Sequence, residues 1–262
     1  MSKTDKIATF AAVSCVHCPH APQSVLDWVK GRLEEIKPTH FIMLGDLFDA
    51  TSASVHPNDT VEDLEVEFEH GANVLSQLRG ALPVASKLIW TLGNHDDNII
   101  TEDPRRTPRA LRSLLHWNNH YEFGGEFRKW KQIPYKKNPK GIYRLGPCRF
   151  FHGFRAAVNS NELETLEMRE SINDQANTFW IRGHTHKPVP PTQCRKTQGI
   201  LLPWWYANAG TIGPLDPPYM DRKNSSQWGH GLISGECSLS SPRRPSRTDW
   251  DANLEIFERV AP

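Results

Sequence analysis

The sequence predicts an α/β fold built around a parallel β-sheet. Three short apolar runs typical of strands, at residues 7–13, 41–44 and 88–92, alternate with two segments at residues 22–36 and 61–78 whose apolar residues recur at the spacing of one helix face. Strands that alternate with helices pair in parallel through right-handed crossover connections. Helices then cover both faces of the sheet, and ligands bind at the carboxyl ends of the strands.

The second half of the chain is predicted to be rich in strands. Apolar runs indicate strands at residues 142–145, 149–151 and 179–181, near Ile200 and Tyr206, and along Leu254, Ile256 and Val260. Helical spacing predicts helices at residues 108–117 and 162–176. The Pro-rich residues 188–191 separate two of the strands, and the Pro- and Arg-rich residues 238–249 predict a mobile loop.

Length, charge and cysteine content narrow the class of protein. A chain of 262 residues has the size of one large α/β domain, so we expect a single domain over residues 1–262. The 31 Lys and Arg residues against 30 Asp and Glu residues argue against a surface that binds polyanions as a whole. No apolar run approaches the length of a membrane span, and an odd number of cysteines, five, does not suit a secreted disulfide framework. We therefore expect a cytoplasmic protein that makes no membrane contact.

Residues able to bind metal follow the apolar runs that predict the sheet. They are Cys15 and His17 after the first run, Asp46 and Asp49 after the second, Asn94, His95 and Asp96 after the third, and His152, His184 and His186 after two later runs. One such cluster taken alone fits an ordinary turn. Five of them, each at a strand end and four beside a Gly that lets the backbone turn sharply, predict one shared site, because the ends of parallel strands lie along one edge of a sheet.

The order of these clusters resembles the motif series of the calcineurin-like metallophosphoesterases, which runs DxH, GDxxD, GNHD or GNHE, a single His, and GHTH. The matching stretches here are Ser-Cys-Val-His at residues 14–17, Gly-Asp-Leu-Phe-Asp at 45–49, Gly-Asn-His-Asp at 93–96, His-Gly at 152–153 and Gly-His-Thr-His at 183–186. Residues 208–211 resemble the family's Asn-x-Gly-Ser/Thr stretch, so the resemblance spans residues 7–213. It implies a four-layer α-β-β-α sandwich of two mixed sheets flanked by helices, with the metal site at the strand carboxyl ends.

The resemblance also implies two metal ions and their ligands. One ion would be held by His17, Asp46 and His186, and the other by Asn94, His152, His184 and the bridging carboxylate of Asp46. This mixture of carboxylate, imidazole and amide ligands suits divalent or trivalent Mn, Fe or Zn. A hydroxide that bridges two such ions would attack the phosphate ester.

The remaining site residues are expected to act around these ligands. His95 would donate a proton to the leaving group, with Asp96 orienting its ring. Asp49 is expected behind the metal ligands. Arg182, beside the last motif, is expected to meet a phosphate of the substrate or to pair with a carboxylate.

The first motif departs from the family, because Cys15 stands where the family has Asp. A buried thiol can simply pack, which leaves the first metal with fewer ligands, whereas a thiolate ligand favours Zn or Fe over Mg or Mn. The same exchange is found in some lariat-debranching relatives of the family, whose other motifs differ from these. We expect one of the two metals to be held less tightly. Cys15 and Cys18 also form a C-x-x-C pair, for which a redox role is an alternative.

A basic and aromatic stretch at residues 128–140 suggests a second kind of contact. It interleaves Trp130 and Tyr135 with the basic residues Arg128, Lys129, Lys131, Lys136, Lys137 and Lys140. Such residues can grip phosphates and stack on bases, which makes nucleic acid a candidate partner. The alternative is a solvated loop or hairpin.

Together these residues predict an enzyme that hydrolyses phosphate esters with two metal ions. An acid at His95 assists a poor leaving group and therefore favours a phosphodiesterase. A phosphomonoesterase, including a protein phosphatase, is the alternative within the same class. A different alternative, motivated by Cys15, is a non-catalytic scaffold on a degenerate phosphoesterase fold. The many polar groups at one edge of the sheet argue against a scaffold, because polar groups are costly to bury.

Overall fold

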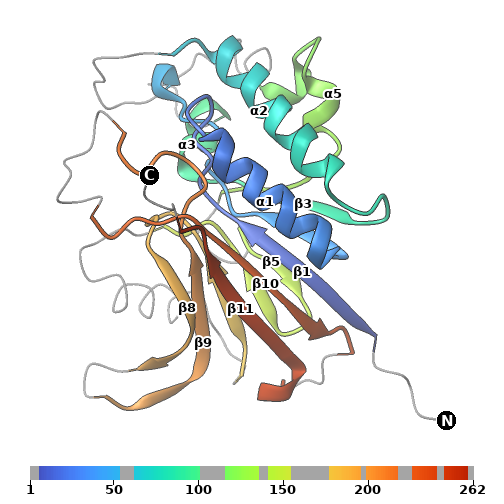
Figure 1. Cartoon of the computed structure of the whole chain (residues 1–262), viewed down its shortest axis with the longest axis vertical. Coiled ribbons are helices and arrows are strands. Elements are labelled where there is room, and N and C mark those ends of the chain that lie inside the picture. The colour runs from blue at the N-terminus through green and yellow to red at the C-terminus, as the bar shows by residue number, and fades with distance from the viewer. Residues whose placement is uncertain are drawn as a thin grey trace.

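Two mixed β-sheets pack face to face at the centre of the molecule, and helices cover the outer face of one of them (Figure 1). The structure, a computed structural model, describes residues 6–53, 62–100, 116–135, 141–154, 177–195, 199–217, 226–240 and 245–258. Each sheet contains both parallel and antiparallel neighbours. The α/β class and the expected pair of mixed sheets are thus confirmed.

The first sheet has six strands, in the order β11 (Trp250–Ile256), β10 (Gly231–Ser238), β1 (Ile7–Val13), β2 (His40–Met43), β3 (Lys87–Thr91) and β4 (Lys131–Ile133). The strands β1 to β4 run parallel, whereas β10 and β11 extend the sheet antiparallel. The parallel set confirms the prediction from the alternating apolar runs. It also places the carboxyl ends of β1, β2 and β3 at one edge of the sheet.

The second sheet has five strands, in the order β5 (Tyr143–Leu145), β6 (Cys148–Phe150), β7 (Phe179–Arg182), β9 (Leu201–Ala209) and β8 (Pro188–Arg195). β6, β7 and β9 are parallel neighbours. β8 takes in the Pro-rich residues 188–191, which did not predict a strand. It lies at the edge of the sheet with breaks in its register, where prolines are tolerated because no ladder hydrogen bond is lost. β9 is one continuous strand where two were expected.

Two helices, α1 (Gln23–Ile36) and α2 (Leu64–Gly80), lie side by side against the first sheet (Figure 1). Their apolar residues recur on one face, which is the face that each helix buries. α1 ends where Lys37 adopts a left-handed conformation and donates its N–H to the carbonyl of Leu33. α2 begins at Asp63, whose carboxylate accepts a hydrogen bond from the N–H of Glu65. Both helices confirm the predicted ones to within a few residues.

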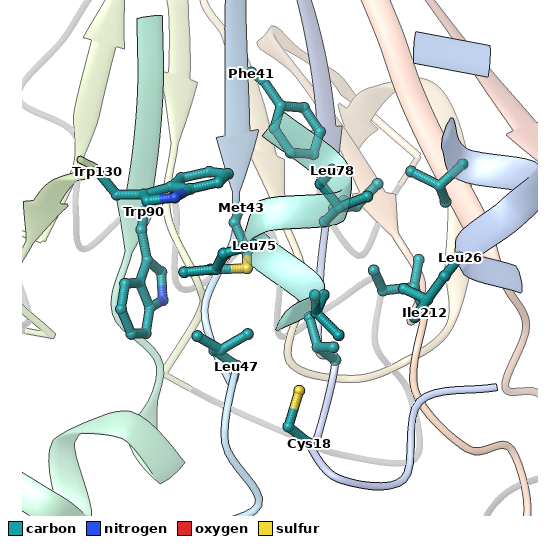
Figure 2. Packing of buried hydrophobic residues seen from close by; sticks show 14 of the residues in the cluster. Cys18, Leu26, Phe41, Met43, Leu47, Leu75, Leu78, Trp90, Trp130 and Ile212 are labelled. Carbon is teal, nitrogen blue, oxygen red and sulfur yellow. The ribbon is translucent and has the colours of Figure 1, made fainter. Parts of the chain in front are cut away.

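The two faces of the first sheet carry two separate hydrophobic cores, because successive side chains of a strand point to opposite faces. On the helix side, Phe41 and Met43 of β2 pack with Leu75 of α2 (Figure 2). On the other side, Phe10 of β1 meets Phe150 of β6 edge-on, with ring centres 5.2 Å apart. At roughly 25 cal/mol per Å² of buried apolar surface, these cores hold the layers together and fix the strand ends relative to one another.

Smaller elements complete the described part of the chain. They are α3 (Asn94–Ile100), α5 (Gly124–Phe127) and the 3-10 helices Thr51–Ala53, Trp117–Asn119 and Arg247–Asp249. The last of these lies within the predicted loop of residues 238–249, where Ser246 and Asp249 form a capping box. The predicted helix at 162–176, and residues 108–115 of the other, lie outside the described residues. Among the helices that the structure does describe, none combines the length and apolar character needed to cross a membrane.

Candidate metal centre

The predicted site residues come together where the strands of both sheets end. The loops after β1, β2 and β3 approach those after β6 and β7. Nε2 of His17 lies 3.2 Å from Nε2 of His186, which is 169 residues away in the sequence. Nε2 of His152 lies 3.1 Å from Oδ2 of Asp46. Side chains from the first and the second sheet thus meet within contact distance.

The backbone of these loops bends through left-handed conformations. Positive φ angles between 50° and 69° occur at Cys15, His17, Asp46, His184 and His186. Such conformations strain any residue other than Gly, and they persist where the surrounding structure fixes them, which is typical of functional sites. Gly45, with φ of 81°, is needed for a second reason, because a Cβ there would lie 2.6 Å from Nδ1 of His152.

The first group of candidate ligands surrounds Nε2 of His152. Nδ1 of this ring donates a hydrogen bond to the carbonyl of Leu44 at 2.6 Å, which leaves Nε2 as the ring atom that faces the other ligands. Three further ligand atoms lie 3.1 Å from Nε2, namely Oδ2 of Asp46, Oδ1 of Asn94 and Nδ1 of His184. Burial lowers the pKa of His184 well below its usual value, so that ring is neutral. A cation among these four atoms would satisfy lone pairs that otherwise repel one another.

The carboxylate of Asp46 lies between this group and a second one. Its Oδ2 is 3.1 Å from Nε2 of His152 and 4.0 Å from Nε2 of His17. Burial opposes its ionisation, but the neighbouring rings of His152 and His95 outweigh burial and hold the pKa of Asp46 well below its usual value. Its Oδ1 accepts a hydrogen bond from the backbone N–H of His95 at 3.0 Å. A fixed, ionised carboxylate at this position can bridge two cations.

The second group surrounds Nε2 of His17. Nδ1 of His17 donates a hydrogen bond to Oδ1 of Asp49 at 2.9 Å, which leaves Nε2 for a metal and is the usual way a metal-binding histidine is oriented. Burial opposes the ionisation of Asp49, but this hydrogen bond outweighs it and lowers the pKa. Burial also lowers the pKa of His186 well below its usual value, and Nδ1 of His186 has no hydrogen-bond partner within the described ranges. Asp49 therefore lies on the Nδ1 side of His17, whereas His186 lies on the Nε2 side.

The thiol of Cys15 reaches both groups. Its sulfur forms one candidate metal site with His17 and His186 and another with Asp46 and His152, with the ligand atoms of each site within 4.8 Å of one another. The side chain is fully buried, and its sulfur accepts a hydrogen bond from the N–H of His184 at 3.3 Å. Burial, reinforced by the charge of Asp46, raises the pKa of the thiol well above its usual value. A bound cation would favour the thiolate instead.

Cys18, the other half of the C-x-x-C pair, lies elsewhere. It is fully buried in the hydrophobic core between the first sheet and the helices, together with Leu47 (Figure 2). No disulfide joins any of the five cysteines, each of which is described. Because Cys15 faces the ligand groups and Cys18 faces the core, the structure gives no support to a redox pair.

His95 is oriented by Asp49, whereas the sequence suggested Asp96. Nδ1 of His95 donates a hydrogen bond to the backbone carbonyl of Asp49 at 2.6 Å, and 30% of its side chain is exposed. The Asp96 carboxylate is instead fully buried. It accepts hydrogen bonds from the N–H groups of Leu47, Phe48 and Gly93 and from Nε1 of Trp90. Burial and the charge of Asp46 raise the pKa of Asp96 to about 6. Asp96 thus ties the turn after β2 to the turn after β3.

Arg182 is placed inside the protein. The side chain is fully buried at the end of β7, and Nε donates a hydrogen bond to the carbonyl of Gly183 at 3.3 Å. The guanidinium fills the space beside Gly153, where a Cβ would lie 2.8 Å from it. At this position Arg182 supports the loops after β6 and β7. Its charge is not presented to a phosphate of the substrate, which was the first of the two expectations for this residue.

The described part of the basic stretch at residues 128–140 runs from the end of α5 into β4, with Arg128, Lys129 and Lys131 exposed and Trp130 buried. Trp130 is buried in the helix-side core and cannot stack on a base (Figure 2). Lys129 pairs with Glu126 at 2.5 Å, and Lys131 begins the strand β4. Residues 136–140 lie outside the described residues. The described part of this stretch favours the alternative, a solvated loop or hairpin, over a surface that binds nucleic acid.

Three residues near the site were not predicted from the sequence to belong to it. The ring of Trp228 lies 4.2 Å from that of His186, and the ring of Tyr135 lies 6.0 Å from that of His152. No motif marks Trp228, and the sequence singled out Tyr135 only as part of the basic stretch at residues 128–140. Glu67 of α2 lies behind the turn after β2, with Oε2 2.7 Å from the N–H of Ala50. A signal for Glu67 existed, because it shares the buried helix face of Gly71, Val74 and Leu78.

Two mixed sheets that gather histidine and carboxylate ligands at their strand ends define the metallophosphoesterase class of proteins. Residues 8–188 match the family model of the calcineurin-like phosphoesterases, and the chain belongs to this family. This match confirms the family that the order of the motifs in the sequence predicted. No protein of curated function is significantly similar to the chain in sequence.

Several solved structures are similar to this chain at low sequence identity. Vps29 of Chaetomium thermophilum is 12% identical, with 97% of each chain covered and a TM-score of 0.42. PhoD is 9% identical, with 99% of this chain and 73% of that chain covered and a TM-score of 0.45. A dimetal phosphatase of Danio rerio is 10% identical, with 87% of this chain and 92% of that chain covered and a TM-score of 0.38. Similarities of this size indicate nothing about substrate.

Proposed function

We propose that the protein is a metal-dependent hydrolase of phosphate esters, with a preference for phosphodiesters. The observation that carries the proposal is the position of Asp46, whose Oδ2 lies 3.1 Å from one imidazole and 4.0 Å from another. An ionised carboxylate shared by two groups of histidines is a donor set that suits a dinuclear centre.

The ligands divide into two sets that share Asp46. His17 and His186 would hold one metal with Asp46, and Asn94, His152 and His184 would hold the other with Asp46. Cys15 lies within reach of both sets, and its sulfur favours Zn or Fe over Mg or Mn. When bound, such a metal pair supplies Lewis acidity toward the phosphate and activates water for attack.

His95 supplies the proton for the leaving group. Its Nδ1–H is held by the carbonyl of Asp49, so the other ring nitrogen carries the transferable proton. Burial lowers its pKa, but the charge of Asp46 and the hydrogen bond to Asp49 outweigh burial and raise the pKa above its usual value. This upward direction favours the protonated, acidic form of the partly exposed ring. A protonated acid helps most when the leaving group is poor, as the alcohols released from phosphodiesters are.

A panel of aryl phosphate monoesters and diesters, assayed with Mn, Fe, Zn, Mg and a chelator, tests this function. We expect hydrolysis that a chelator abolishes and that is faster with the diesters. Asp46→Asn is the matched control, because it keeps the shape and removes the charge. Faster monoester hydrolysis would establish a phosphomonoesterase or protein phosphatase instead. The absence of any metal-dependent hydrolysis would favour the scaffold alternative.

We further propose that residues 1–262 form one domain in the cytoplasm. The C-terminal strands β10 and β11 complete the first sheet, so they belong to the same unit as the residues that match the family. The five cysteines are buried and form no disulfides, which suits a reducing compartment. A single cooperative unfolding transition and the location of a tagged full-length chain in cells test these two points.

A further inference from the structure

Glu67 is a buried carboxyl group behind the site with no part in the proposed reaction so far. It lies near the start of α2, on the face that packs against the sheet, and its side chain is fully buried. Oε2 accepts a hydrogen bond from the backbone N–H of Ala50 at 2.7 Å, and Oε1 has no hydrogen-bond partner in the part of the chain that the structure describes. A carboxyl group is costly to bury, so its presence here calls for a reason other than packing.

The helix α2 is fitted closely to the turn that follows β2. The rings of Phe68 and Phe48 lie 5.2 Å apart. At Gly71 the helix comes so near that a Cβ would lie 2.6 Å from the ring of Phe48. Glu67 adds a polar contact with Ala50 to these apolar ones. The start of α2 and residues 48–50 are therefore packed as one unit.

The hydrogen bond from Ala50 acts on the residue that orients two histidines. Ala50 has a φ of 52°, a left-handed conformation that its surroundings must hold in place. The preceding residue, Asp49, accepts hydrogen bonds from Nδ1 of His17 at 2.9 Å and from Nδ1 of His95 at 2.6 Å. The second of these bonds uses the backbone carbonyl of Asp49, which belongs to the same peptide group as the N–H that Glu67 holds.

We propose that Glu67 is a positioning residue of the site. By accepting the hydrogen bond of Ala50 it fixes the peptide group between residues 49 and 50, and through Asp49 it fixes the rings of His17 and His95. Glu67 contacts neither substrate nor metal. What the two rings do chemically rests on the proposed function, whereas how they are held rests on the contacts described above.

Two variants of Glu67 separate positioning from packing. Glu67→Gln keeps an oxygen that can accept the hydrogen bond of Ala50. Glu67→Met keeps the length of the side chain and a high helix propensity but has no comparable acceptor. Asp63→Ala is the control for the stability of this end of α2, because it removes a cap whose hydrogen bond lies within the helix.

The ring tautomers of the histidines give a readout that requires no substrate and no metal. In metal-free protein labelled with ¹⁵N-histidine, long-range ¹H–¹⁵N spectra at alkaline pH, where imidazoles are neutral, distinguish a hydrogen on Nδ1 from one on Nε2. We expect His17 and His95 to carry the hydrogen on Nδ1 in the wild type, in Glu67→Gln and in Asp63→Ala. We expect both to show mixed tautomers in Glu67→Met.

Kinetics and zinc binding give the second readout. We expect Glu67→Met to lower kcat by about 10–100-fold with KM unchanged and to weaken the binding of zinc alone, since outer-shell substitutions typically have effects of that size. Glu67→Gln should keep most of the wild-type kcat and most of the wild-type affinity for zinc. Wild-type tautomers in a folded Glu67→Met, or equal losses in Asp63→Ala or Glu67→Gln, would overturn the proposal. If the tautomers change as expected while no variant or wild type hydrolyses an ester, the positioning role stands and the proposed function fails.

Discussion

The backbone carbonyl of Asp49 accepts a hydrogen bond from Nδ1 of His95 at 2.6 Å, while the carboxylate of the same residue holds Nδ1 of His17 at 2.9 Å. One residue thus orients two imidazoles, the one that we propose as the proton donor and one that we propose as a metal ligand. The two rings should therefore respond to substitution in different ways.

Replacing His95 by Gln should slow hydrolysis without removing the metals. Loss of a general acid costs about 10²–10⁴ in rate, and the loss should be largest for esters whose leaving groups most need a proton. The measurement is kcat of His95→Gln on a series of aryl esters with leaving groups of different acidity, together with the metal content of the variant. A uniform loss across the series would show that His95 is not the acid.

Replacing Asp96 by Asn should destabilise the protein. Its carboxylate accepts three hydrogen bonds from two turns and a fourth from the ring of Trp90 in β3, and an amide would turn its NH₂ group toward two of these donors. Leaving buried donors unpaired costs about 2–4 kcal/mol. Urea unfolding of the metal-free variant measures this loss. If Asp96 instead oriented the ring of His95, the variant would keep its stability and lose kcat alone.

The stability of the metal-free protein should fall as Glu67 ionises. Burial raises the pKa of Glu67 from its usual 4.5 to about 7, so the folded protein keeps a proton that the unfolded chain has already lost. The contribution of Glu67 is therefore complete below pH 4.5 and is lost as the pH rises to 7. A shift of this size corresponds to about 3 kcal/mol.

Urea unfolding of wild type and Glu67→Gln at several pH values tests this expectation. Because Gln does not titrate, the free energy of unfolding of the variant should fall less over the same pH range. Parallel curves for the two proteins would show that Glu67 titrates normally. Asp63→Ala, which changes an exposed cap of the same helix, should parallel the wild type.

Replacing Cys15 by Asp should change which metal the site prefers. This substitution restores the acidic residue of the family motif at a position whose sulfur lies within reach of both ligand groups. Exchange of a soft sulfur for a hard oxygen should weaken zinc binding at least about 10-fold and favour manganese. Competition titrations with the two metals, with Cys15→Ser as the control, measure the change. An unaltered preference would mean that Cys15 only packs.

The strands that carry the ligands could be predicted from the sequence because each is a buried apolar run that ends in turn residues. β1 was predicted to the residue, and β2 and β3 to within one residue. β10 could not be predicted. Its residues mix Gly and polar side chains, and its place depends on antiparallel pairing across the whole chain, with Ile7 opposite Ser238.

The convergence of the ligands was predictable for a related reason, since parallel strands end at one edge. The roles of residues around the ligands were not. Asp96 is adjacent to His95 in sequence, but both lie in α3, where neighbouring side chains point in different directions. Glu67 acts through a backbone N–H, and no pattern of residue types reveals which peptide group a distant side chain will bind.

Calorimetric titration of the metal-free protein with zinc tests most directly whether Asp46 joins two metal sites. The wild type should take up two ions per chain, one more weakly than the other. Asp46→Asn should lose at least one of them, because the amide cannot supply the shared charge. Two ions bound to Asp46→Asn with the affinities of the wild type would contradict the shared carboxylate and the reaction built on it.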